Sequence, residues 1–357
     1  MRVNHLWIDD DMKSLPKIVD PIYNQEKTYT AFEQWLLKFI SDKRDLPFIY
    51  LCVQLTLMIV PFAIFLYTPI LKGGWWWLAA LGYVVLTLGI YMGPFILMLH
   101  NTCHRRFFKQ EYNIGNYYIP WILGFFFGQS PETYFSHHIG MHHAENNQLE
   151  DRSSTMMYQR DNFWHFMHYF GTFLLIGAVH LVEYFKSKSR KKFVQKVIRG
   201  ELTFVLLCVA LSFISFKATM IVFVTPFVVS RFGMMAGNWA QHAFIKADDP
   251  ENNYVNSITI INSTYNRRCF NDGYHIGHHL RPHMHWTDMP KHFLKNLDNY
   301  SRQKAIIFEG MDFVMVWFWL MTKRYDVLAN KFINVNNTFQ TKEEVMALLR
   351  ERTRRSI

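Results

Sequence analysis

The run GGWWWLAALGYVVLTLGIYMGPFILML occupies residues 73–99, contains no charged side chain and continues directly into HNTCH at residues 100–104. A transmembrane helix needs about 20 predominantly apolar residues, so this run is long enough to cross a bilayer. The tryptophans at its start suit the interface between membrane and water. Cations follow at Arg105, Arg106 and Lys109, and positive charge collects on the cytoplasmic side of membranes. We therefore expect His100 and His104 at the cytoplasmic end of this helix.

A second apolar run lies immediately before the first. Residues 46–71 carry no charge, and only Lys72 separates the two runs. Because both runs are long enough to span and their connection is short, they predict a transmembrane hairpin. Pro61 and Pro94 do not oppose this prediction, because proline is tolerated inside membrane helices.

Two further apolar runs, 162–182 and 202–230, leave the topology open. In one arrangement each run is a single span. In the other, 162–182 lies on the surface and 202–236 forms a second hairpin that turns at Lys217. The segment between the runs carries seven cations: Lys186, Lys188, Arg190, Lys191, Lys192, Lys196 and Arg199. The positive-inside rule favours the second arrangement, which keeps this segment cytoplasmic. Its weak point is the apolar stretch 202–216, which covers only about 22 Å of a core about 30 Å thick.

These runs predict an all-α integral membrane protein with four transmembrane helices in two hairpins and a cytoplasmic, histidine-rich helical cap. We expect residues 1–45 to form a cytoplasmic arm, 46–290 the membrane domain, and 291–357 a cytoplasmic helical tail. Residues 31–40 suit a short amphipathic helix, and the broken stretch 112–131 suits an interfacial or re-entrant element. The net charge of +10 lies beside apolar runs, which favours an anionic membrane surface over nucleic acid. The four scattered cysteines indicate neither a disulfide framework nor a thiolate zinc site.

Histidine occurs in four spaced motifs that all fall on the expected cytoplasmic side. They are H-x3-H at His100 and His104, H-x3-H-H at His138, His142 and His143, N-x3-H at Asn238 and His242, and H-x2-H-H at His275, His278 and His279. Neutral imidazole is the commonest metal ligand, and nine histidines with one asparagine suit two ions of five or six ligands each. The motifs hold no thiolate ligand pair and no carboxylate, which disfavours structural zinc, calcium and magnesium. Iron, copper, zinc or nickel would suit them.

Several neighbours of the motifs are open to two interpretations. His137 competes with His138 as the first ligand of its motif. We choose His138, because a helix places residues four apart on one face, and His142 is four residues from His138 but five from His137. Four nearby carboxylates could orient ligand histidines or could simply be solvated: Glu132, Glu145, Asp151 and Asp272. We expect His283, His285 and His292 around the site or at the surface.

The order and spacing of the motifs, in register with the apolar runs over about residues 46–290, resemble the membrane fatty acid desaturase superfamily. HHLRP at 278–282 is similar to the usual end of the third box of that family. The resemblance implies a di-iron centre held by the nine motif histidines, with Asn238 acting through a water, and O2 as co-substrate. It implies desaturation of a fatty acyl lipid or thioester, with electrons from a separate cytochrome b5 or ferredoxin, since the chain has no His-Pro-Gly-Gly stretch. The expected location is the plasma membrane or endoplasmic reticulum, with the active site on the cytoplasmic side.

One motif departs from the usual pattern. Most desaturases have H-x2-H-H in the second box, and the H-x3-H-H here resembles the alkane hydroxylase branch, so hydroxylation or alkene-forming decarboxylation remains an alternative. A metal transporter would place its ligands near the bilayer midplane. A zinc hydrolase would need one ion and a carboxylate base. Nine histidines outside the spans argue against both of these classes.

Overall fold

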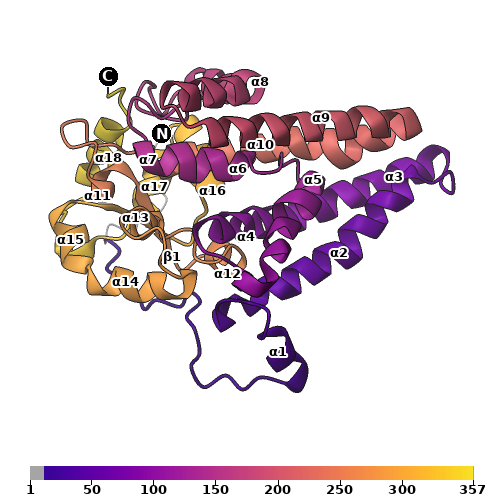
Figure 1. The fold of residues 1–357 in the computed structure, drawn as a ribbon. Coiled ribbons are helices and arrows are strands. Elements are labelled where there is room, and N and C mark those ends of the chain that lie inside the picture. The colour runs from indigo at the N-terminus through magenta and orange to yellow at the C-terminus, as the bar shows by residue number, and fades with distance from the viewer. Residues whose placement is uncertain (1–11, 357) are drawn as a thin grey trace, which may run out of the picture.

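The computed structural model describes residues 12–356, and almost all of its regular structure is helical (Figure 1). Four helical stretches are long and apolar enough to cross a membrane: Lys43–Tyr67, Gly73–His104, Phe163–Ser187 and Lys191–Gln241. The last of these covers 51 residues, about twice the length that a single span needs. Its path, and that of the third stretch, decide between the two topologies.

The first hairpin consists of α2 and a longer partner that changes helix type along its length. Its elements are η1 (Lys43–Asp45), α2 (Leu46–Tyr67), α3 (Gly73–Val84), the π-helix η2 (Val85–Tyr91) and α4 (Met92–His104). The turn between α2 and α3 begins its return at Gly73, which has a φ of +55°, a conformation that glycine adopts without strain. The prediction of a first hairpin that ends in His100 and His104 is confirmed.

The second hairpin is a single helical stretch folded in two. It contains α9 (Lys191–Thr219), the π-helix η6 (Met220–Val224) and α10 (Thr225–Gln241). Helical geometry breaks at Ser215, with φ −155° and ψ 103°. The rings of Phe204 and Phe227 lie 5.1 Å apart, and Arg231 lies 3.8 Å from Glu201, so α9 and α10 run antiparallel about a turn near residue 216. This is the hairpin that the sequence predicts around Lys217.

The tips of the two hairpins meet. Tyr67 and Thr219 share a hydrogen bond of 2.8 Å between their hydroxyl groups. The Lys217 ammonium lies 4.2 Å from the centre of the Trp76 ring, a cation–π contact. Both hairpins therefore reach the same depth, on the side opposite the cap (Figure 1).

Helix α8 (Phe163–Ser187) lies across the bundle at its cap end. Near its start, Phe166 packs against Trp239 of α10, with ring centroids 5.5 Å apart. Near its end, Phe185 packs against Phe193 at the beginning of α9, 4.7 Å away. Both partners belong to the cap ends of their helices, so α8 does not run from one face of the membrane to the other. The protein thus has four transmembrane helices in two hairpins, and α8 covers them from the side.

Short elements connect the first hairpin to α8. They are the 3-10 helix η3 (Gln110–Tyr117), the π-helix η4 (Ile119–Leu123), α5 (Gly124–Phe126), α6 (Thr133–His137), the π-helix η5 (His138–His142) and α7 (His143–Glu145). This agrees with a broken, interfacial stretch. Gly128, at φ +68°, presses against α10 so closely that a Cβ would lie 2.2 Å from the Phe227 nitrogen. Only glycine fits there, and the contact fixes the connector against the second hairpin.

The remainder of the cap follows α10. Its elements are α11 (Asn253–Asn256), β1 (Ile258–Ile261), α12 (Thr264–Arg268), α13 (His275–Leu280), η7 (Trp286–Asp288), α14 (Met289–Lys295), α15 (Leu297–Arg302), β2 (Ile306–Glu309), α16 (Phe313–Met321), α17 (Tyr325–Lys331), η8 (Val335–Asn337) and α18 (Lys342–Arg352). Strands β1 and β2 pair in parallel, with Ile258 opposite Ile306. The sequence gives no sign of this small sheet. Because β2 belongs to the expected tail, the tail and the residues around β1 share one hydrophobic core.

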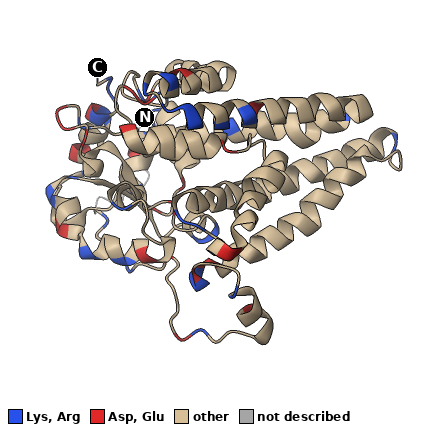
Figure 2. Cartoon of the chain, in the orientation of Figure 1, with Lys and Arg blue, Asp and Glu red and all other residues tan. Residues whose placement is uncertain are grey.

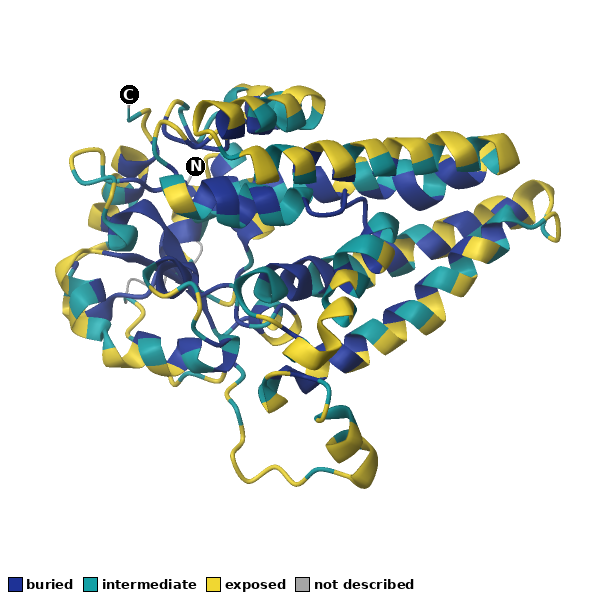
Figure 3. Ribbon diagram, viewed as in Figure 1, coloured by how far each residue is buried: buried dark blue, intermediate teal, exposed yellow. Residues whose placement is uncertain are grey.

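Burial separates the cap from the bundle (Figure 3). The inside of the cap is buried, whereas the outward faces of both hairpins expose large apolar side chains such as Leu57, Leu81 and Phe213. A band of exposed apolar surface on helices of this length suits contact with lipid. At the N-terminus, α1 (Ala31–Leu36) likewise exposes Phe32 and Trp35, as an amphipathic helix at the interface should.

Candidate metal centre

The nine histidines of the motifs come together at the cap end of the bundle, in two adjacent groups. The first group contains His100, His104, His138 and His278, and the second contains His142, His242, His275 and His279. Within each group, one nitrogen atom of every residue lies within 4.8 Å of the others. The ninth, His143, joins the first group through its Nε2 atom, 2.9 Å from Nε2 of His278. Every group draws on segments far apart in the sequence.

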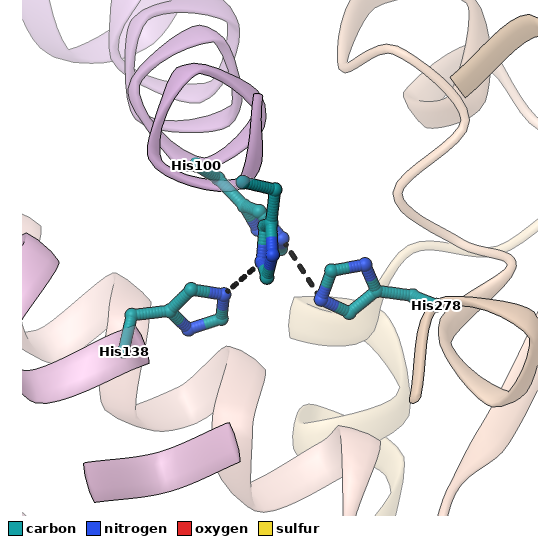
Figure 4. A group of neighbouring side chains, drawn as sticks. His100, His138 and His278 are labelled. Carbon is teal, nitrogen blue, oxygen red and sulfur yellow. Dashed lines mark hydrogen bonds between the residues drawn. The ribbon is translucent and has the colours of Figure 1, made fainter. Parts of the chain in front are cut away.

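In the first group the Nε2 atoms converge from three directions (Figure 4). Nε2 of His100 lies 3.1 Å from that of His278, and Nε2 of His104 lies 2.8 Å from that of His138. His143 completes the set, with its Nε2 atom 3.2 Å from Nε2 of His138. The five imidazoles therefore surround one common point.

The second group repeats this arrangement with four rings. Nε2 of His275 lies 3.4 Å from that of His242 and 3.0 Å from that of His279. His142 faces both partners, with ring centroids 5.3 Å from His242 and 5.4 Å from His279. All four side chains are buried.

The separations between these nitrogens fit metal coordination. Two imidazole nitrogens bound to one ion at about 2.1 Å, and about 90–110° apart, lie about 3.0–3.4 Å from each other. The tautomers of two rings also suit a metal ion. The Nδ1 atoms of His142 and His242 face the acceptors Asp151 Oδ2 and Asn256 O at 2.7 and 2.8 Å, so each must carry the ring proton there. Their Nε2 atoms are then free lone pairs, as a metal requires.

Burial favours the neutral form of several of these rings. It lowers the pKa of His242 to about 3 and that of His143 to about 2, with nearby histidines adding to the effect. The pKa values of His275, His278 and His279 lie well below the usual range for the same two reasons. A neutral imidazole is the form that binds a metal ion.

Two carboxylates face the Nδ1 atoms of ligand histidines, on the side of the ring away from the group centre. Asp151 is fully buried and accepts from Nδ1 of His142, while its other oxygen accepts from Ser153 N at 2.8 Å. Burial alone would raise the pKa of Asp151, but the hydrogen bonds that it accepts from His142 and Ser153 hold this pKa below its usual range. Asp272 lies 3.4 Å from Nδ1 of His100, and burial raises its pKa to about 7. Carboxylate–histidine pairs of this kind fix the orientation of metal ligands.

The second motif adopts a π-helix, which changes the reason for choosing His138. In the π-helix η5, residues five apart rather than four apart face the same way, so His138 and His143 join one group and His142 turns to the other. His137 belongs to neither group, and its buried Nε2 atom has no hydrogen-bond partner among the described residues. The placement favours His138 over His137, but the argument from a shared α-helical face was wrong for this segment.

Asn238 lies one turn before His242, at the edge of the second group. Its amide nitrogen donates to Ser153 O at 3.0 Å and to the Tyr169 hydroxyl at 2.7 Å. Both N–H donors are thereby used, so only the amide oxygen remains to act as an acceptor. Asn238 also lines the cavity described next, where that oxygen can meet a water or a ligand.

A mostly apolar cavity of about 310 Å³ leads from the histidines into the space between the two hairpins. One wall comes from η2 and α4, from Leu88 to His100, and the opposite wall from α10, from Ser230 to Gln241. Gly233 and Gly237 leave that wall open, because a Cβ at either position would meet no atom within 4 Å. We call this space the inter-hairpin cavity. It is a suitable place for an alkyl chain.

The other residues named from the sequence lie around the centre. Nδ1 of His283 lies 3.0 Å from His104 O, and Nε2 of His285 lies 2.9 Å from Asp45 Oδ1. Glu132 pairs with Lys196 and Arg199 and does not reach a ligand histidine. Sequence reasoning missed Tyr134, whose ring stacks on His138 with centroids 5.5 Å apart. It also missed the carbonyl of Asn256, and no sequence signal identifies a backbone acceptor.

Comparison with protein-family models places residues 74–310 in a match to the family described as fatty acid desaturase. The match covers well over half of the chain and includes the second arm of the first hairpin from residue 74, the whole second hairpin, both histidine groups and both walls of the inter-hairpin cavity. No curated protein and no solved structure matches the chain.

Proposed function

Because the chain belongs to the fatty acid desaturase family, we propose that it is a membrane-bound, O2-dependent desaturase that uses two iron ions to introduce a double bond into a fatty acyl lipid or thioester. One observation carries the proposal. Nine histidines form two metal-sized groups at the end of an apolar cavity between two membrane hairpins. Attack on an unactivated C–H bond needs such a metal pair and a dry, shaped cavity.

Each histidine group would hold one iron ion. His100, His104, His138, His143 and His278 would bind the first ion, and His142, His242, His275 and His279 the second, with Asn238 reaching it through a water. When bound, the iron pair supplies the activation of O2. In the balanced reaction, O2 takes two hydrogens from the chain together with two electrons and two protons, and leaves as two waters.

The protein would position the chain and exclude water. Leu88, Met92 and Ile96 line the first wall of the inter-hairpin cavity, and the glycines of α10 leave room opposite them. An alkyl chain held there lies beside His100 and His275 at the cap end. Asp151 and the Asn256 carbonyl keep the Nδ1 protons of His142 and His242, so both rings present unprotonated Nε2 atoms to a metal.

Sidedness and partners follow from the charges. The cap carries the basic segment 186–199, so we place the cap, and with it the active site, on the cytoplasmic side of the membrane. The membrane would be a bacterial-type plasma membrane or that of the endoplasmic reticulum. The two electrons would come from a separate cytochrome b5 or ferredoxin.

In the structure, the H-x3-H-H spacing by which the sequence resembles the alkane hydroxylase branch forms a π-helical turn. The extra residue is absorbed in η5, where His138 and His143 face one group just as His275 and His279 face the other across an ordinary helical turn. Hydroxylation and decarboxylation stay outcomes of the experiment.

Lipid and hydrocarbon profiling of cells that express the protein tests the proposal, with a His278→Ala, His279→Ala double variant as the inactive control. New double bonds that disappear in the variant establish a desaturase, and their position gives its regiochemistry. Hydroxylated chains or terminal alkenes in place of double bonds would reject desaturation. Iron analysis of the purified protein should give about two ions per chain, whereas one tightly bound zinc ion would contradict the di-iron assignment.

A further inference from the structure

Four cations gather at a hollow on the cap, although they are scattered in the sequence. Lys323, Arg350, Arg354 and Arg355 line a surface hollow of about 660 Å³ together with Asp161 and Tyr325. We call these four the C-terminal cation patch. The only carboxylate in the lining, Asp161, accepts from the Tyr325 hydroxyl at 2.9 Å. No carboxylate among residues 12–356 forms an ion pair with any of the four cations.

The more obvious basic segment is partly neutralised. In the run 186–199, Lys188 pairs with Glu145 and Glu150, and Lys196 and Arg199 pair with Glu132. A fourth cation of that run, Arg190, donates to Gly140 O at 2.6 Å. Figure 2 shows acidic residues close to this basic segment. The C-terminal cation patch differs from this segment in that all four of its cations lack a carboxylate partner among residues 12–356.

A buried arginine connects the backbone next to this patch with the backbone next to a ligand histidine. Arg160 is fully buried, and its guanidinium donates to Arg352 O at 3.0 Å and to Arg354 O on one side. On the other side its Nε donates to Ala243 O at 2.9 Å, and Ala243 follows His242 in the chain. A single side chain therefore connects the patch to a histidine of the second group.

Aromatic rings provide a second connection between the same two places. The half-buried ring of Tyr158 lies 5.5 Å from Trp239 and 5.7 Å from Tyr169, and Trp239 lies 5.1 Å from Tyr169. Trp239 donates to Arg160 O at 2.9 Å, and the Tyr169 hydroxyl accepts from Asn238. The rings thus lead from Tyr158, which precedes the hollow-lining Gln159 in the chain, to Asn238 at the edge of the second histidine group.

We propose that the C-terminal cation patch is the docking surface for an acidic one-electron carrier protein, a proposal that rests on the function proposed above. The carrier gives up one electron at this surface and is oxidised by one electron, and the metal centre is reduced by one. Two such transfers supply the electrons that each O2 requires. Complementary charge speeds association of such partners and fixes their orientation.

The test measures docking without turnover. The protein is loaded with redox-inert zinc in nanodiscs of neutral phosphatidylcholine, and its affinity for two acidic probes is measured at low salt: the haem domain of a cytochrome b5 and a plant-type ferredoxin. The test variant is Arg354→Glu, Arg355→Glu. The matched control is Lys191→Glu, Lys192→Glu, which reverses two adjacent exposed cations of the run 186–199 that make no ion pair within the described chain.

We expect the test variant to bind at least one probe about tenfold or more weakly and the control to bind it as the wild type does. Added salt should weaken wild-type binding more than it weakens binding of the test variant. Equal loss in both variants, loss in the control alone, or failure of both probes to bind the wild type overturns the proposal. The proposal is also overturned if the test variant loses affinity for the probes only in nanodiscs that contain anionic lipid. That result would assign the patch to the membrane surface. Because zinc-loaded protein performs no reaction, these results stand apart from lipid profiling.

Discussion

At the scale of single residues, the histidine motifs do not correspond to metal sites one by one. The second and fourth motifs each divide their histidines between the two groups, whereas both histidines of the first motif, His100 and His104, enter the same group. The spacing in the sequence indicates which residues are ligands. It does not indicate which ion each one would bind, because that depends on how helices from three parts of the chain meet.

His137 and His138 give a matched pair for testing this assignment. Nε2 of His138 faces the first group, whereas Nε2 of His137 has no partner within the described residues. We expect His138→Ala to reduce bound iron from about two ions per chain to about one, and His137→Ala to keep both ions. Iron per chain, measured after dialysis against a weak chelator, checks the prediction. Equal iron loss in the two variants would contradict it.

The sequence predicts the ligand histidines but not the carboxylates that contact them. Asp151 and Asp272 stood near motifs in the sequence, but so did Glu132 and Glu145, and nothing in the spacing separates the two pairs. In the structure Asp151 and Asp272 contact His142 and His100, whereas the two glutamates meet cations. A carboxylate chooses its partner through tertiary contacts, which no local pattern encodes.

At the scale of elements, the π-helix η5 is held in place by the turn between α8 and α9. Arg190 donates to Gly140 O, one of the backbone acceptors of the π-helix. Gly140 also lies against two rings, since a Cβ there would be 2.8 Å from Phe185 Cζ and 2.9 Å from Phe193 Cε1. A single methyl group at this position would therefore disturb the helix that carries His138, His142 and His143.

Gly140→Ala tests this packing. We expect it to destabilise the protein by about 1–3 kcal/mol, the usual effect of overfilling a packed site, and to lower the bound iron. The control is Gly171→Ala in α8, where a Cβ meets no atom within 4 Å and where alanine favours the helix by about 1 kcal/mol. Thermal unfolding and iron content are measured for both. A control that loses as much iron as Gly140→Ala would show that the effect is not specific to η5.

Helix α8 shows where element-level prediction was ambiguous. Its sequence is apolar enough to span, and length and composition alone place it among the candidate spans. The seven cations that follow decide the matter, because burying the run in the bilayer would carry them across. The structure agrees with that electrostatic argument and places both ends of α8 at the cap. Strands β1 and β2, by contrast, are four residues each and pair across the cap, so no local pattern announces them.

At the scale of the whole molecule, the two-hairpin topology predicts where each turn is accessible. Lys217 lies at the tip of the second hairpin and Ser187 at the cap end of α8. We expect a cysteine at 217 to react with a membrane-impermeant maleimide added from outside the cell, and a cysteine at 187 to react only after the membrane is opened. The unmodified chain is the control for the native cysteines. Reaction of both positions from outside would require α8 to span.

The buried histidines also make the whole fold sensitive to pH. In the folded, metal-free chain the pKa of His242 is about 3, because it is buried beside His142, whereas an unfolded histidine has a pKa of about 6.5. Below about pH 6.5 the unfolded chain therefore binds more protons than the folded one. Stability is complete above that pH and falls as the pH falls, by about 1.4 kcal/mol per unit for each such histidine.

Denaturant unfolding of the metal-free protein, followed by circular dichroism at about pH 7.5 and about pH 5.5, measures this effect. We expect a clearly lower midpoint at the acidic pH. An unchanged midpoint would mean that the histidines are accessible to protons in the folded state, contrary to their burial.

The contact between the hairpin tips closes the end of the inter-hairpin space that lies farthest from the histidines. The inter-hairpin cavity reaches Leu88, which precedes His100 by twelve residues, or about 18 Å of helix. Beyond it the space is filled by core side chains such as Tyr83 and Val222, and the tips are joined by Tyr67, Thr219, Lys217 and Trp76. A chain that enters methyl end first meets a blind end. If the proposed desaturation takes place at the histidines, the distance from the methyl end of the chain then fixes the position of the double bond.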